Sequence, residues 1–402
     1  MKLLTFSTLF PNAVTPGHGI FVETRLRHLL ASGKVESRVV APVPWFPFSD
    51  PRFGRYANFA RVPVEEIRHG IKVLHPRFAQ IPKIGMNLAP TLLAHSAKRV
   101  LGDMIDDGYD FDLIDAHYFY PDGVAAMKLG RYFNKPVVIA ARGSDISLIP
   151  QYRLPRTMIR WAADNAHGVI TVCNALKTEM VQLGVSADKI TPLRNGVDLA
   201  LFHPASADER QAIRQAAGID GFTIVTVGHL VPVKGHDLVI GALPLMPDVN
   251  LFIIGNGMER ERLQALADSL HVSHRVKFLG ALPQAELVRY YNAADALVLA
   301  SSREGWANVL LESMACGTPV VASNVWGTPE VVASPDAGRL LRERSESGIA
   351  EAIGMLRENY PDRAATRRYA ERFSWEDTTA GQLRLFNAIL KREPEAVLAC
   401  AQ

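Results

Sequence analysis

The sequence predicts an α/β protein of two domains, each with a parallel β-sheet covered by helices on both faces. Short apolar runs typical of strands alternate with amphipathic segments typical of helices, which is the pattern of βαβ units. Many of the strand-like runs are almost continuously apolar, as expected when both faces of a sheet are buried. A length of 402 residues suffices for two domains of ordinary size.

The expected elements follow this alternation along the chain. In the first half we expect strands at 2–7, 37–43, 71–75, 112–117, 136–141, 168–172 and 190–194, and helices at 21–33, 87–106, 122–133 and 174–184. In the second half we expect strands at 222–228, 249–255, 275–280, 296–300 and 319–323, and helices at 234–246, 258–271, 284–294 and 308–317.

The boundary between the two domains is expected near residues 194–206, which carry the Asn, Gly, Pro and Ser signals of a loop. The sequence therefore predicts a first domain at 1–195 and a second at 196–374. A helical tail at about 375–393 is expected to pack back on the first domain and to form part of a hinge. Ligands of such sheets bind at the carboxyl ends of the strands, so we expect the two halves to face a central cleft.

Composition favours a cytoplasmic protein. Cys173, Cys316 and Cys400 contain no CxxC pair, which argues against a disulfide framework or a zinc site. The apolar N-terminal run is short and is interpreted as a first buried strand, because it lacks a long apolar core and a cleavage site. No stretch reaches the roughly 18 apolar residues that a membrane-spanning helix needs.

The net charge of +3 is unevenly divided. Residues 1–195 hold 24 Lys and Arg against 16 Asp and Glu, so the remaining residues hold 20 against 25. A basic first half is compatible with peripheral contact with an anionic membrane or with a phosphate-bearing acceptor, and equally with scattered solvated charge. The same two interpretations apply to an amphipathic region around Arg77, Lys83, Lys98 and Arg99.

The strongest motif is SSREGWANVLLESMACGT at 301–318, which follows an expected strand and opens a helix. Glu304 and Glu312 are eight residues apart, a little over two helical turns, so both carboxylates are able to face one direction. Residues 305–309 would form a helix N-terminus whose free N–H groups bind phosphate or sugar oxygens. The alternative is an ordinary helix with two exposed glutamates.

Four weaker polar clusters also follow expected strands. They are His229 and Lys234 in VGHLVPVKG, Gly17 and Gly19 in the loop at 9–26, His117 in DAHYFYPDG, and Arg142 with Asp145 in ARGSDIS. Taken singly, each is more often structural than catalytic. Their shared position just past strand ends favours a common site, and neither a Walker P-loop nor GxGxxG is present.

The chain resembles, over essentially its whole length, the retaining glycosyltransferases of family 4, which have the GT-B fold of two Rossmann-like domains. SREGWANVLLESMACGTPVVAS at 302–323 resembles the family's EX7E signature, and it is followed by GTPEVV. RNGVDLALFHP resembles the interdomain NGVD segment, and VGHLVPVKGHDLVI the phosphate-binding turn. PGHGIFVETRLRHL and the DAHYFYPDG and ARGSDI segments look most like the teichuronic-acid and exopolysaccharide branch of bacterial enzymes.

The resemblance implies roles for individual residues. Glu304 would contact the donor sugar, Glu312 the ribose hydroxyls and Lys234 the diphosphate. In the first domain, Gly19 would admit the phosphate and sugar, His117 would lie beside the anomeric carbon, and Asp145 would shape that face. The backbone of Ala281 and Leu282 would read the base. The amides of Trp306, Ala307, Asn308 and Val309 would touch the phosphate or sugar.

The chain departs from the family at three places. His229 stands where the family usually has Arg, so one charge on the diphosphate would depend on pH. Val233 replaces a common acidic residue, and the usual HGxD reads as residues 142–145, RGSD. These departures change the side chains that would surround the phosphate.

The implied reaction is transfer of a hexose-type sugar, with retention, from a nucleotide diphosphate sugar to a saccharide or lipid-linked acceptor in surface polysaccharide biosynthesis. A UDP-sugar is the first expectation and a GDP-sugar the second. Lys234, His229, Arg194 and the helix N-terminus would stabilise the leaving diphosphate. We expect front-face attack, no cofactor, no metal because a DxD-like pair is missing, and no nucleic-acid partner. A degenerate scaffold or sugar-binding subunit and a nucleotide-sugar epimerase are the alternatives.

Overall fold

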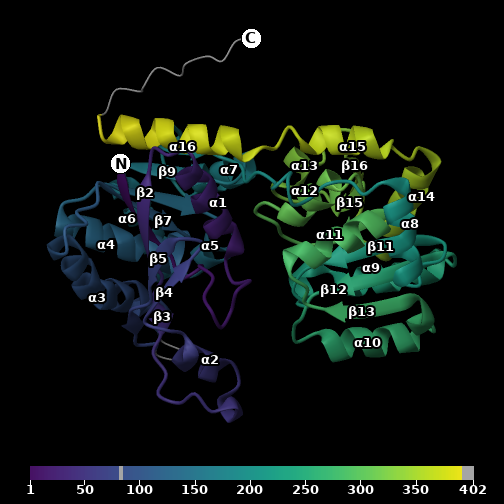
Figure 1. Ribbon diagram of the computed structural model, residues 1–402, viewed down its shortest axis with the longest axis horizontal. Helices are drawn as coiled ribbons and strands as arrows, with labels where there is room; N and C mark the ends of the chain where they lie inside the picture. The colour runs from purple at the N-terminus through teal and green to yellow at the C-terminus, as the bar shows by residue number, and fades with distance from the viewer. Residues whose placement is uncertain (81–84, 392–402) are drawn as a thin grey trace, which may run out of the picture. The chain divides into compact units, whose positions relative to one another are not determined.

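The computed structural model describes residues 1–80 and 85–391 and divides into two compact α/β units (Figure 1). The first unit comprises Met1–Arg194 together with the chain from Glu376 onward, and the second comprises Asn195–Trp375. Each is built on one sheet, and a short two-stranded ladder of β3 (Val43–Pro44) and β6 (Arg77–Phe78) accompanies the first.

The sheet of the first unit has eight strands in the order β10-β9-β8-β7-β1-β2-β5-β4. Their bounds are β1 Lys2–Phe6, β2 Glu36–Val40, β4 Glu65–Arg68, β5 Ile71–Leu74, β7 Leu113–His117, β8 Val137–Ala141, β9 Gly168–Thr171 and β10 Ile190–Pro192. All pairs are parallel except the hairpin of β4 and β5. The expectation of a wholly parallel sheet was therefore wrong at this edge, where His69 and Gly70 both adopt positive φ, as a tight hairpin turn requires.

Helices accompany the strands of the first unit in sequence. They are α1 Ile20–Ala31, α2 Arg55–Arg61, α3 Gly85–Asp106, α4 Val124–Phe133, α5 Ser144–Ser147, α6 Arg153–Asn165, α7 Asn174–Gln182 and α16 Trp375–Ile389. The sequence reading had assigned no element to α2, α5 or α6.

The C-terminal helix α16 contributes to the core of the first unit. The Phe386 side chain is fully buried in a cluster with Leu3, Leu113 and Ile170. Gly168 in β9 lies against the Leu385 and Ile389 side chains, where a Cβ atom would meet them at 3.3 and 3.2 Å. The last helix therefore belongs to the unit that the N-terminus begins, because its apolar face is buried there.

The sheet of the second unit has six strands in the order β13-β12-β11-β14-β15-β16, all parallel. The strands are β11 Phe222–Val227, β12 Val249–Ile254, β13 Val276–Gly280, β14 Ala296–Leu299, β15 Val320–Ser323 and β16 Gly338–Leu341. The helices are α8 Ala207–Ala216, α9 His236–Ala242, α10 Arg260–Ser269, α11 Gln284–Ala293, α12 Asn308–Ala315, α13 Thr328–Val331, α14 Glu346–Glu358 and α15 Arg363–Ala370. The sequence reading had not assigned β16, α8, α13, α14 or α15.

The expected helix at 234–246 is shorter than predicted. Helix α9 ends at Ala242 and continues as a single 3-10 turn at Leu243–Leu245. Pro244 lies inside that turn and has no N–H to extend the helical hydrogen bonding, which explains the change.

Cys173 and Cys316 are buried and are not joined in a disulfide, whereas Cys400 lies outside the described residues. Within residues 1–80 and 85–391, no helix combines the length and the apolar character needed to cross a bilayer.

Candidate active site

In the second unit, the expected donor-binding residues gather at one edge of the sheet. His229 follows β11, Ala281 and Leu282 follow β13, and the loop containing Glu304 follows β14. Because these strands are parallel members of one sheet, their carboxyl ends share an edge. The polar turns therefore lie together although the sequence separates them.

Lys234 and Glu304 form an ion pair at this edge. The Nζ atom of Lys234 lies 2.6 Å from Oε1 of Glu304, and the Ser301 hydroxyl donates to the same oxygen at 2.7 Å. The Ser302 amide donates to the Val233 carbonyl at 2.8 Å, which ties together the two turns that follow the paired strands β11 and β14. The cation expected to face a diphosphate thus also positions the acid expected to face the sugar.

Glu312 lies within α12 and is buried, so the alternative of two exposed glutamates is wrong for it. Its carboxylate accepts hydrogen bonds from the Tyr291 hydroxyl at 2.8 Å and from the Gln284 amide at 3.3 Å. Burial raises the pKa of Glu312, and the Tyr291 hydrogen bond opposes that rise. The two acids therefore have separate sets of partners.

Glu304 lies in the turn before the helix, as the sequence predicts, so helical periodicity does not relate its direction to that of Glu312. Helix α12 begins at Asn308, so Glu304 lies in the preceding loop and only Glu312 is on the helix. No side chain caps this N-terminus at Ala307, so the first amides of α12, including those of Asn308 and Val309, remain suited to anion binding.

The indole of Trp306 has a structural role beside this helix. It is buried, and its Nε1–H donates to the Asn195 carbonyl at 3.0 Å. The Asn195 amide in turn donates to the Asn308 side-chain oxygen at 3.3 Å. Any contact of Trp306 with a donor is consequently left to its main chain, as the resemblance implies.

The His229 side chain is exposed at the end of β11. Its carbonyl is 3.2 Å from Nε2 of His236, a buried residue whose pKa is lowered to about 4 by desolvation. The backbone of Gly228, which precedes His229, packs closely against Gly255, where a Cβ would lie 1.8 Å from the Gly228 carbonyl oxygen, so position 255 requires glycine. The turn is thus fixed by buried neighbours and presents the His229 ring outward.

In the first unit, His117 is the last residue of β7 and is only 2 % exposed. Its Nε2 lies 3.2 Å from an Asp115 carboxylate oxygen, and its Nδ1 is hydrogen-bonded by Nη2 of Arg142. Burial lowers the pKa of His117 to about 4, against the opposing effect of Asp115. The ring is neutral at pH 7, and both of its nitrogens are engaged by protein groups.

Asp115 and Arg25 are members of this cluster that the sequence reading missed. The Arg25 guanidinium is fully buried and donates to the Leu193 carbonyl at 3.2 Å. Burial and, to a smaller extent, the nearby Arg142 lower its pKa to about 9, and Asp115 opposes them. The signal for Asp115 was its place two residues before His117 in DAH, whereas nothing in the amphipathic first helix distinguished Arg25.

Asp145 is buried and organises the loop after β8. Its carboxylate accepts backbone hydrogen bonds from Gly143 at 2.7 Å, Arg142 at 3.0 Å and Phe119 at 2.7 Å. It thereby joins the loops after β7 and β8, a geometry compatible with shaping a binding face. Asp122, which the sequence reading did not single out, joins the segment after β7 to the loop after β1. Its oxygens accept hydrogen bonds from the Thr8 amide at 2.7 Å and from the Ser7 hydroxyl at 3.3 Å.

Gly19 precedes α1 with φ of 68°, and a Cβ there would lie 2.3 Å from the Leu9 carbonyl oxygen. Protein packing alone therefore requires glycine at this position, whether or not a ligand approaches. Gly17 has nothing within 4 Å of its Cβ position and carries no such requirement.

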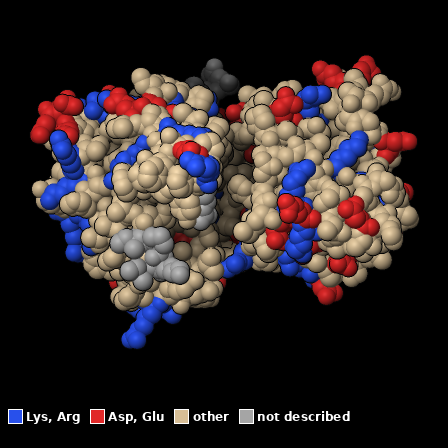
Figure 2. Space-filling view, turned by 90° about the horizontal axis from the view of Figure 1, so that it is seen from below, with Lys and Arg blue, Asp and Glu red and all other residues tan. Residues whose placement is uncertain are grey.

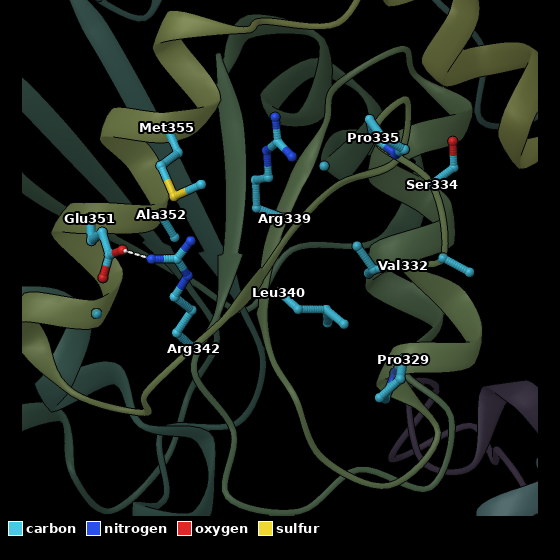
Figure 3. A pocket seen from close by; sticks show the side chains of 13 residues that line it. Pro329, Val332, Ser334, Pro335, Arg339, Leu340, Arg342, Glu351, Ala352 and Met355 are labelled. Carbon is cyan, nitrogen blue, oxygen red and sulfur yellow. Dashed lines mark hydrogen bonds and ion pairs between the residues drawn. The ribbon is translucent and has the colours of Figure 1, made fainter.

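A cavity of about 480 Å³ in the second unit lies apart from these residues (Figure 3). It is lined by β16 and by the segments around α13 and α14, and Arg342 forms an ion pair with Glu351 there at 2.8 Å. None of the expected donor-binding residues lines it. Among the described residues, no group of three or more His, Cys, Asp or Glu side chains converges as a metal site.

Two family models match this chain, one in each half. Residues 17–201 match the model of Glycosyltransferase Family 4, and residues 209–373 match that of Glycosyl transferases group 1. A D-inositol 3-phosphate glycosyltransferase of Corynebacterium urealyticum is 30% identical over 81% of this chain and 83% of its own length. A putative teichuronic acid biosynthesis glycosyltransferase of Bacillus subtilis, TuaC, is 28% identical over 88% of both chains.

Among solved structures, the Anabaena protein HepE in complex with UDP has a TM-score of 0.72 at 22% identity and covers 96% of this chain and 100% of its own. Together with the two sheets, this likeness defines the GT-B fold. The chain belongs to the family 4, or group 1, glycosyltransferases, which use nucleotide sugars, retain the anomeric configuration and need no metal.

Proposed function

We propose that this protein transfers a hexose-type sugar from a UDP-sugar to a saccharide or lipid-linked acceptor during bacterial surface polysaccharide biosynthesis. The observation that carries the proposal is the Lys234–Glu304 ion pair beside the uncapped N-terminus of α12. A cation, a carboxylate and free amides at one strand edge suit a sugar joined to a diphosphate. The similarity to TuaC, a putative teichuronic acid biosynthesis glycosyltransferase, supports the pathway, and the UDP bound to HepE supports the choice of nucleotide.

The chemical roles follow from where charge develops. As the nucleoside diphosphate departs, negative charge grows on phosphate, and Lys234, His229 and the first amides of α12 stabilise it. Glu304 exchanges part of its contact with Lys234 for donor sugar hydroxyls, and Glu312 accepts from the ribose. Ala281 and Leu282 offer their main chain to the base. The acceptor attacks from the side of the leaving phosphate, which takes its proton.

In this proposal, residues of the first unit position the donor sugar. A neutral His117 adds no positive charge next to an anomeric carbon that becomes cationic, and Asp115 and Arg142 hold its ring in one orientation. Asp145 keeps the neighbouring backbone in place through its hydrogen bonds. Gly19 sets the path of the loop that admits the phosphate and sugar.

Contact with a membrane is proposed for an aromatic patch of Trp45, Phe48, Phe53 and Tyr56, whose side chains are 59, 54, 41 and 42 % exposed. The Phe48 and Phe53 rings stack at 5.1 Å. The patch lies around α2, which Figure 1 shows beyond β3 and β4 of the first unit. Exposed aromatic rings next to arginine are typical of the interfacial layer of an anionic bilayer, and Arg52 and Arg61 belong to this segment.

The amphipathic region around Arg77, Lys83, Lys98 and Arg99 is less suited to membrane contact than the aromatic patch. Arg77 donates to the carbonyl oxygens of Phe59 and Val62 and so holds the C-terminal end of α2 in place. Lys98 lies 3.6 Å from the Tyr132 ring centroid, and Lys83 is outside the described residues. In the view of Figure 2, Lys and Arg side chains are scattered among other residues and form no single continuous patch.

A panel of nucleotides tests the donor. Bound ligand stabilises the fold by mass action, so UDP should raise the melting temperature more than GDP or ADP at equal concentration. Incubation with UDP-glucose and UDP-galactose should release UDP slowly with the anomeric configuration retained in the freed or transferred sugar. Absence of binding and turnover would support the scaffold alternative, and interconversion of the two UDP-sugars would support the epimerase.

A further inference from the structure

A second pocket in the second unit is lined by arginines and is separate from the donor residues. Its volume is about 490 Å³, and it lies at the first turns of α8 and α15. It is lined by Pro204, Ala205, Ala207, Arg210, Arg363, Ala364, Arg367 and Arg368. Four of these eight residues are arginines and none is acidic, which is unusual because like charges repel.

Hydrogen bonds on the protein side fix three of the guanidinium groups. Arg210 donates to the Asn292 carbonyl at 3.0 Å, Arg363 to the Cys316 carbonyl at 3.0 Å, and Arg367 to the Ala315 carbonyl at 2.8 Å. These carbonyls lie at or just past the C-terminal ends of α11 and α12. The arginines are therefore held in place by carbonyl acceptors at helix C-termini, whose partial negative charge offsets only part of the positive charge of the guanidinium groups.

Nearby carboxylates compensate only part of this charge. Asp295 pairs with Arg210 at 2.6 Å and with Arg214 at 3.1 Å, and Glu371 pairs with Arg367 at 2.8 Å. Asp362 caps α15 by accepting from the Ala364 amide at 3.3 Å.

Arg363 and Arg368 form no ion pair with a carboxylate of the described chain. Burial lowers the pKa of Arg363, and the nearby Arg210 adds to this effect while Tyr360 opposes it. The Arg368 side chain is exposed at the rim. The pocket thus combines three guanidinium groups that are held by protein acceptors with one exposed guanidinium group, that of Arg368.

We propose that this pocket binds a phosphomonoester. Guanidinium groups are the side chains best matched to phosphate oxygens, because each presents several N–H donors in one plane. The pocket volume lies within the range of small-molecule sites and leaves room for an organic group of about sugar size beside the phosphate. The site is distinct from Lys234 and Glu304, and it would give the protein a second phosphate-recognising surface.

Isothermal titration of the full chain tests the proposal, with glucose 6-phosphate and inorganic phosphate as probes. The ester should bind at one site, and Arg368→Glu should weaken that binding at least about tenfold, because it places a carboxylate at the mouth. Arg372→Glu is the matched control: this arginine is also exposed, lies over the Tyr369 ring and does not line the pocket, so binding should be unchanged.

A Lys234→Ala variant separates this site from the proposed donor site and should bind the ester as the wild type does. Equal binding by Arg368→Glu and Arg372→Glu, or loss of binding in Lys234→Ala, would overturn the proposal. So would the absence of ester binding, or phosphate binding as tight as that of the ester. Circular dichroism of each variant shows that the fold is retained.

Discussion

The Nζ atom of Lys234 lies 2.6 Å from Oε1 of Glu304, across seventy residues of sequence. The pair forms because β11 and β14 are neighbours in the sheet and each delivers one of these residues just past its end. Its side chains are only 24 % and 10 % exposed, so solvent screens the interaction incompletely. Whatever the ligand, this pair sets the charge at the edge where α12 begins.

Removing either member of the pair should abolish efficient transfer. Lys234→Ala and Glu304→Ala should each lower kcat/KM with a UDP-sugar by about 10²- to 10³-fold, because each removes a charged contact to the reacting diphosphate sugar. Steady-state kinetics checks this. Glu286→Ala, which removes an exposed acid paired with Arg289, is the control and should remain active. Near-normal turnover of both site variants would refute the assignment.

Tyr291→Phe should weaken both stability and donor binding. It removes the hydroxyl that donates to Glu312 at 2.8 Å and leaves a buried carboxylate with one fewer donor. The expected loss is about 1–3 kcal/mol of unfolding free energy, measured by urea denaturation, with a higher donor KM.

Tyr290→Phe provides the matched comparison for this change. Tyr290 is the preceding residue of α11, and its ring packs edge-on against Phe252. Removing its hydroxyl should alter neither stability nor KM. If the two variants behave alike, Tyr291 does not position Glu312.

His117 should make the protein sensitive to acid. Its pKa is lowered from 6.5 to about 4 by burial, so the unfolded chain takes up a proton first as the pH falls through this window. Acid therefore favours unfolding, and His117 should account for a loss of up to about 3 kcal/mol between pH 7 and pH 4.

Urea unfolding of His117→Gln at several pH values measures this contribution. The variant should show a flatter decline of unfolding free energy below pH 6.5 than the wild type. His274→Gln, which changes an exposed histidine, should retain the wild-type slope. A His117→Gln slope equal to that of the wild type would contradict a neutral, buried imidazole.

Gly19→Ala should destabilise the first unit, whereas Gly17→Ala should not. Alanine at position 19 must adopt φ of 68° and bring a Cβ to 2.3 Å from the Leu9 carbonyl oxygen, so the loop has to move. We expect a loss of at least about 1–2 kcal/mol, visible as a lower melting temperature. Equal melting temperatures for the two variants would show that the loop accommodates a side chain.

The aromatic patch should hold the protein on anionic vesicles. A Phe48→Ser, Phe53→Ser double variant should lose most co-sedimentation with vesicles containing phosphatidylglycerol, because it removes two of the four exposed rings. Met258→Ser, at an 82 % exposed position of the second unit, is the control. Binding that survives the double variant, or that is equal on zwitterionic vesicles, would exclude the patch as an anionic-membrane contact.

The sequence by itself determined the alternation of buried strands and helices, because apolar periodicity is local. The β4–β5 hairpin escaped prediction, since β4 (EEIR) carries three charged residues in four and is not an apolar run. Family resemblance found Glu304, Glu312 and Lys234 through the spacing of one motif and the turn before α9. The number of residues between the two acids does not give their relative direction, because Glu304 lies in the turn before α12 and only Glu312 is on the helix.

Only the tertiary structure decided which charges meet. Asp115, Arg25 and Arg142 surround His117 because their strands and helix converge in one core, and the resulting burial makes the imidazole neutral. The Lys234–Glu304 pair and the arginine pocket likewise join residues from distant segments. Short-range preferences along the chain specify the helices and strands. Electrostatic interactions depend on the distances between charged groups and on their burial, and both are set only when the sheets assemble.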